Sequence, residues 1–98
     1  MKMVVVMYLE EDEGIVTRLL EGLGVSSFSS VKLEGHGEGS PGWYGDVEPF
    51  ESRMVFAVLP KGKAGELLSA VAELRGGSHP EHPVHAIQMA VERTAAST

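Results

Sequence analysis

The chain has 98 residues, no cysteine and a formal net charge of −6. This length predicts one domain, and the lack of cysteine excludes disulfides, thiolate metal sites and a cysteine nucleophile. The acidic balance argues against general affinity for nucleic acid or anionic membranes. The N-terminal apolar run is too short for a signal peptide, and no segment is long enough to span a bilayer. We therefore expect a cytoplasmic protein without direct membrane insertion.

The first half of the chain predicts a strand, a helix and a second strand. Residues 2–9, KMVVVMYL, are apolar on both alternating faces, which is typical of a strand buried on both sides. The acidic run 10–13, EEDE, predicts a helix start that faces solvent, with a hard-cation site as the alternative. Gly22 and Gly24 predict the end of this helix. Residues 28–35, FSSVKLEG, alternate and indicate a half-exposed strand.

The second half predicts a strand, a helix and a last strand. It begins with a long glycine-rich segment, residues 35–51, which we expect to be a loop. Residues 52–60, SRMVFAVLP, form another run that is apolar on both faces. Residues 61–77 carry an apolar stripe at helical spacing and end in two glycines, which predict the end of the helix. Residues 84–94 alternate and predict the last strand.

The predicted order is βαββαβ, the pattern of a ferredoxin-like α+β sandwich. It implies one domain over residues 1–94, with a frayed tail at residues 95–98. Two helices would cover one face of a four-stranded antiparallel sheet whose central strands are the first and third. The other face of these apolar strands would be bare in a monomer. Burial against copies of the same chain is the simplest explanation for such a face.

Two stretches resemble the P-II signalling protein superfamily. They are SSVKLEGHGEG, which leads out of the second strand, and HAIQMAVERT near the end. Relatives in this superfamily form trimers with their sheets inward, so the resemblance implies a homotrimer. The matching positions are Val31, Lys32, Gly35 and Gly37 in the first stretch and Val91, Arg93 and Thr94 in the second.

The resemblance implies a regulatory or sensor protein. The sequence has no Ser–His–Asp arrangement at a recognisable elbow and no paired carboxylates in an apolar setting, so we expect a protein that is not an enzyme and requires no cofactor. A small effector, such as an adenine nucleotide, would bind in the clefts between subunits. The segment 35–51 would then signal to a protein partner, a transporter or an enzyme. The glycines and the arginine of the site follow from the resemblance, and His36 and Glu38 lie in the same loop. The expected ligand contacts are Gly35, His36, Gly37, Glu38, Gly76, Gly77 and Arg93.

A nucleoside triphosphate needs several cationic partners. This chain offers Arg93 together with Lys32 or Lys61. A less charged nucleotide, a different anion or a metal ion are therefore alternative effectors.

The histidine tract HPEHPVH supports a different class of function. It holds His79, His82 and His85, and imidazoles suit divalent transition metals such as Zn, Cu, Ni or Co. This favours a CutA-like divalent metal-binding protein as the alternative, and His36 could approach the tract across a subunit boundary. In the simpler interpretation these imidazoles are solvated and His85 caps the core face. A ligandless interaction module is the third alternative.

Overall fold

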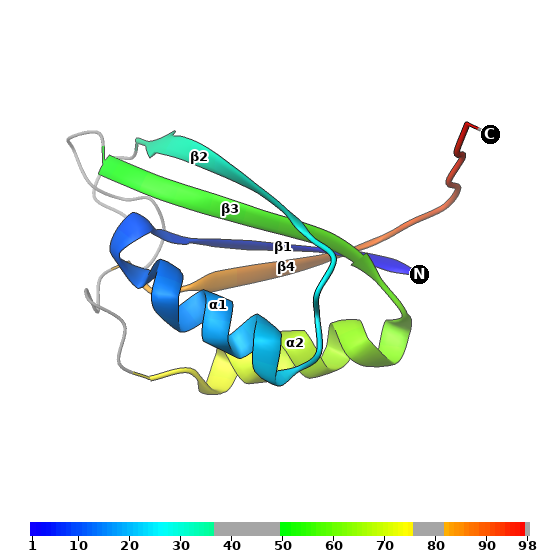
Figure 1. Cartoon of the computed structure of the whole chain (residues 1–98), viewed down its shortest axis with the longest axis horizontal. Coiled ribbons are helices and arrows are strands. Elements are labelled where there is room, and N and C mark those ends of the chain that lie inside the picture. The colour runs from blue at the N-terminus through cyan, green and yellow to red at the C-terminus, as the bar shows by residue number, and fades with distance from the viewer. Residues whose placement is uncertain (37–49, 76–81, 98) are drawn as a thin grey trace.

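The structure, a computed structural model, describes residues 1–36, 50–75 and 82–97. Two helices pack on one face of a four-stranded antiparallel sheet (Figure 1), which is the predicted α+β architecture and is compatible with a ferredoxin-like fold. Neither helix is long and apolar enough to cross a membrane, as far as the described residues extend. The elements are β1 (Lys2–Leu9), the short 3-10 helix η1 (Glu10–Asp12), α1 (Glu13–Gly22), β2 (Ser29–Gly35), β3 (Phe50–Leu59), α2 (Lys61–Glu73) and β4 (His85–Ala90).

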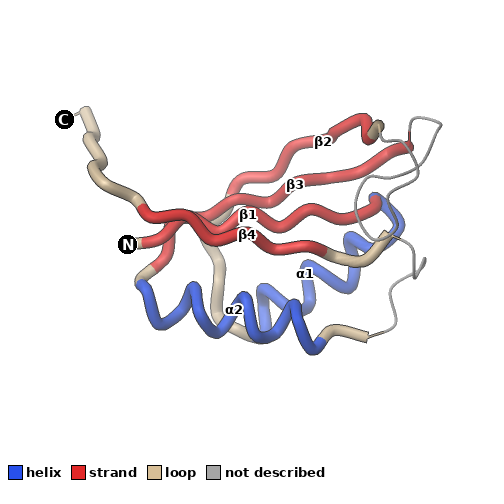
Figure 2. Tube along the Cα trace, turned by 180° about the vertical axis from the view of Figure 1, so that it is seen from behind, coloured by secondary structure: helices blue, strands red, loops and turns tan. Residues whose placement is uncertain are grey.

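The strand order is β2-β3-β1-β4, so β1 and β3 are the central strands, as their apolar faces predict. β1 pairs with β3 along its whole length, from Lys2 opposite Leu59 to Leu9 opposite Ser52. β2 and β4 form the two outer edges, as Figure 2 shows from behind.

The antiparallel pairing gathers particular strand ends at each end of the sheet. Gly35 at the end of β2 lies opposite Phe50 at the start of β3. His85 at the start of β4 lies opposite Met7, close to the end of β1. We call this the histidine end of the sheet, because His36 follows Gly35 there and His85 lies on the far edge.

The core lies between the sheet and the two helices. Alternate residues of the central strands face the helices, because successive side chains of a strand point to opposite faces. Among the helix residues, Leu20 of α1 and Leu67 of α2 are each 1% exposed. The main buried members are Val4, Val6 and Tyr8 of β1, Val55, Ala57 and Leu59 of β3, Val16 and Leu20 of α1, and Ala64 and Leu67 of α2.

The opposite face of the sheet, which we call the open face, is also apolar. Its exposed members lie on three strands and are Val31 (42%), Val58 (44%), Ile87 (37%) and Met89 (42%). Single exposed apolar residues are ordinary, whereas a contiguous apolar group on one face marks a surface that binds something.

The end of α1 agrees with the predicted glycine stop. Gly24 has a φ of 74°, a left-handed conformation that favours glycine. The Gly24 amide donates to the Glu21 carbonyl at 3.0 Å, and the Val25 amide donates to the Leu20 carbonyl at 2.9 Å. These two bonds form a Schellman motif, which satisfies carbonyls at the end of the helix.

The predicted glycine stop of α2 is wrong in position. The helix ends at Glu73, before Gly76 and Gly77. Leu74 already has an extended backbone, with φ −63° and ψ 137°, and is half-buried. The helix therefore ends where this apolar side chain leaves the helical path.

Candidate functional site

Two of the expected ligand contacts lie at the end of β2. Gly35 is buried as the last residue of the strand, and His36 follows it with an exposed ring. The His36 Nε2 lies 2.8 Å from Glu34 Oε2. When Nε2 carries the proton it donates to this carboxylate, and Nδ1 keeps its lone pair. Glu34 therefore orients the imidazole and directs one ring nitrogen away from the pair.

Arg93 lies at the other end of the sheet. β4 ends at Ala90, which pairs with Lys2 at the start of β1, and the exposed Arg93 follows in the tail (Figure 1). A single chain therefore does not bring Arg93 close to His36. The remaining expected contacts, Gly37, Glu38, Gly76 and Gly77, lie outside the described residues.

Two of the histidines in the predicted metal tract lie at the histidine end. His82 is half-buried just before β4, and His85 is the first residue of that strand. Partial burial lowers the pKa of the His85 imidazole, which favours its neutral form. His79 lies outside the described residues. Within the described parts of one chain, no group of three or more His, Cys, Asp or Glu side chains could hold a metal ion.

A network of charges connects η1 and α1 to the sheet. Glu10 Oε1 lies 3.4 Å from Arg53 Nη2 and 3.6 Å from Lys32 Nζ. Glu13 Oε1 lies 3.2 Å from Arg53 Nη1. The Arg53 side chain is only 19% exposed, so its pairs are screened less than the exposed Lys32 pair. The arginine of β3 thus anchors the first helical turns to the sheet.

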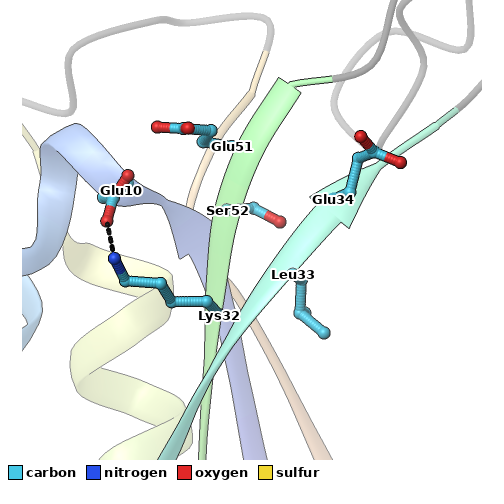
Figure 3. Close-up of a pocket in the computed structure, with 6 residues that line it drawn as sticks. All are labelled: Glu10, Lys32, Leu33, Glu34, Glu51 and Ser52. Atoms are coloured by element: carbon cyan, nitrogen blue, oxygen red, sulfur yellow. Dashed lines mark ion pairs between the residues drawn. The ribbon is translucent and has the colours of Figure 1, made fainter.

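A cavity of about 230 Å³ opens beside this network (Figure 3). Lys32 and Glu51 project to the same side as Glu10, whereas Leu33 and Ser52 project to the other side. Carboxylates outnumber cations here, so the opening favours cationic or neutral groups and does not suit a triphosphate. The lining residues are Glu10, Lys32, Leu33, Glu34, Glu51 and Ser52.

Two carboxyl groups of this cavity shift each other's pKa in opposite directions. A hydrogen bond to Glu51 lowers the pKa of Glu10, and Lys32 and Arg53 lower it further. The same bond raises the pKa of Glu51, and the negative charge of Glu10 raises it further. Of the two carboxyl groups, Glu10 therefore loses its proton at the lower pH.

The prediction that the EEDE run only faces solvent is wrong. Asp12 is 1% exposed, and Glu10 contacts side chains from β2 and β3. Neither feature follows from helix-start chemistry. The sequence does contain one signal for cationic partners of the acidic run. Lys32 and Arg53 occupy paired positions on β2 and β3, but this pairing is known only when the register of the two strands is known.

Comparison with known proteins leaves the family open: no protein-family model matches the chain, and no curated protein matches it.

Proposed function

We propose that the protein is a P-II-like regulatory protein that works as a homotrimer, with a ferredoxin-like subunit. The observation that carries the proposal is the open face, where Val31, Val58, Ile87 and Met89 are each about 40% exposed. A monomer would leave this apolar group in water. Trimers with inward sheets would bury it, and the same assembly would create clefts between subunits.

In this proposal a small effector binds at those clefts. An adenine nucleotide is the first candidate because of the resemblance of the two quoted stretches. Arg93 and His36 lie at opposite ends of one sheet, so an effector that contacts both needs more than one subunit. The acidic cavity beside Glu10 favours an effector with less negative charge than a triphosphate.

The signal would pass through segment 35–51 to a protein partner. A ligand shifts an equilibrium only when it binds one state better than the other. The effector must therefore bind one arrangement of this segment more tightly, and the partner must distinguish the two arrangements.

Calorimetric titration of the purified chain with adenine nucleotides and with cyclic dinucleotides tests the sensor function. We expect heat with at least one nucleotide and weaker binding in Arg93→Ala. Glu66→Ala, a charge change on the exposed face of α2, is the matched control. The absence of heat with every nucleotide would refute the effector proposal.

The second candidate is a CutA-like divalent metal-binding protein. It is favoured by the position of His36, His82 and His85 at the same end of the sheet. Titration with Zn²⁺, Cu²⁺ and Ni²⁺ tests it. If affinity is unchanged after His79, His82 and His85 are all replaced by Ala, the tract does not bind the ion.

A further inference from the structure

A row of soft ligand atoms crosses the open face of the sheet. Met7 of β1 lies directly opposite Met54 of β3 on one side and His85 of β4 on the other. Directly opposed residues of paired strands project to the same face, and His85 shares its face with Ile87 and Met89 further along β4. The three residues therefore lie on the open face and not on the core face, and each is half-buried. We call Met54, Met7 and His85 the thioether row.

The spacing of the thioether row allows its members to share one ion. Directly opposed residues have Cβ atoms about 4.5–5.5 Å apart, so Met7 lies that close to each of its two neighbours. An ion held above Met7 is about one strand spacing, 4.8 Å, to the side of Met54 and of His85. A ligand atom two bonds beyond Cβ, together with a metal bond of about 2.0–2.3 Å, spans about 5 Å. All three side chains can therefore reach the same ion.

The surroundings of the row select the kind of ion. The strand positions of the open face include no Asp, Glu, Lys or Arg. Val5 and Leu9, which flank Met7 on the same face of β1, are 8% and 5% exposed. Hard cations such as Mg²⁺ and Ca²⁺ need several oxygen ligands, which this apolar face does not supply. Thioether sulfurs instead select soft ions such as copper(I).

A second pair of methionines on the open face provides an internal comparison. Met3 lies opposite Met89 on β4 and Val58 on β3. It is four residues from Met7 along β1, about 13 Å away, which is too far for the two pairs to share an ion. The second pair has no imidazole beside it, so it offers fewer ligand atoms than the thioether row.

We propose that the thioether row binds one soft monovalent metal ion, copper(I) or silver(I). The ligand atoms are Sδ of Met7, Sδ of Met54 and one ring nitrogen of His85. The site goes beyond the proposed regulatory function and is complete within one chain. If copies cover the open face as proposed above, they enclose the bound ion and supply none of its ligands.

Silver(I) titration followed by NMR tests the site without redox chemistry, because silver(I) is a soft ion like copper(I) and keeps its oxidation state. The chain has five methionines, so labelling their methyl carbons with ¹³C gives few enough signals to assign. We expect the methyl signals of Met7 and Met54 to shift and to saturate at one ion per chain, while those of Met3 and Met89 stay in place. Similar shifts of every methionine would show unspecific binding and would overturn the proposal.

Variants of the row measure the contribution of each ligand. Met7→Leu and His85→Ala should each weaken silver(I) binding at least tenfold. Exchange of Met for Leu conserves volume and is well tolerated in packed regions, and the same spectra report whether each variant is folded. Met3→Leu is the matched control, since it makes the same exchange on the same face of β1. Equal affinity of Met7→Leu and Met3→Leu would contradict the site.

His82 distinguishes the thioether row from the histidine tract. It precedes β4 and belongs to the tract but not to the row. We expect His82→Ala to bind silver(I) as the natural chain does. A loss of binding in His82→Ala without a loss in Met7→Leu would assign the ion to the tract and overturn the row as its site.

Failure of this site and failure of the proposed function give different results. A trimer in which no methionine signal responds to silver(I) would overturn only the metal site. A monomer that binds one silver ion at the row would overturn the proposed trimer and support the site, because all of its ligands belong to one chain.

Discussion

Substitution of Met89 by lysine tests whether the open face is buried in an assembly. Met89 lies on β4 opposite Met3 and is 42% exposed, so the folded subunit should tolerate the change. Complete burial of a large aliphatic side chain contributes about 1.5–3 kcal/mol. A side chain that is still about 40% exposed can therefore contribute about 0.6–1.2 kcal/mol when copies cover it.

The four exposed side chains of the open face together would contribute about 2.5–5 kcal/mol per subunit. Met89→Lys removes one share and also places an ammonium group in the interface. Lysine can extend its amine toward water, which reduces this cost but does not remove it. We expect a weakening of at least about 1.4 kcal/mol, a tenfold increase in the dissociation constant.

Sedimentation velocity over a range of micromolar concentrations measures this effect. The control is Gln88→Lys, which adds the same charge at the neighbouring exposed residue on the other face of β4. We expect the control to assemble as the natural chain does and Met89→Lys to shift toward monomer. Identical mass distributions for the natural chain and Met89→Lys would refute the burial of this face.

Three further predictions concern the subunit itself. Leu20→Ala should lower the free energy of unfolding by about 2–5 kcal/mol in a urea titration, since the Leu20 side chain is 1% exposed. Leu19 is half-buried beside the same core, and Leu19→Ala is the comparison. A loss in Leu20→Ala no larger than that in Leu19→Ala would contradict the core position of Leu20. Lys63→Met should lower the free energy of unfolding by about 1 kcal/mol in the same assay, because it removes the 2.8 Å hydrogen bond from Nζ to the Leu23 carbonyl. The control is Lys61→Met, which replaces an exposed lysine on the same helix. Equal stability of the two variants would exclude a role for the bond. Carboxyl NMR titration should place the midpoint of Glu51 above the ordinary glutamate value and that of Glu10 below it. The contribution of Glu51 to stability therefore fades as pH rises through its raised pKa, and that of Glu10 fades as pH falls through its lowered pKa. Coincident midpoints would show that the two carboxyl groups do not interact.

The apolar strands were the most predictable part of the fold. Residues 2–9 predict β1 with both of its bounds, because a Val-rich run that is apolar on both faces has few alternatives to a central strand. The end of α2 was less predictable. The glycines at 76 and 77 were an obvious stop signal, but the preceding Leu74 leaves the helical path first.

The candidate site was predictable only in its separate parts. His36 and His85 could be singled out as imidazoles in or beside loops, but their shared end and opposite edges follow from strand order and direction. The network of Glu10 and Arg53 joins residues 43 positions apart, which no local pattern indicates. Such contacts depend on the sheet register, and a register is a property of the paired strands rather than of either one alone.

The central position of β1 also has a consequence for synthesis on the ribosome. β1 is made first, yet its partners are β3 and β4, and Val6 pairs with Val55 and Ala86. At about 5–20 residues per second, the roughly 50 residues before Val55 take about 2.5–10 s to add. During that interval the most apolar strand of the chain has no partner, and it stays half-paired until the last strand emerges. The order of synthesis therefore leaves the strand that later forms the centre of the sheet exposed for longest.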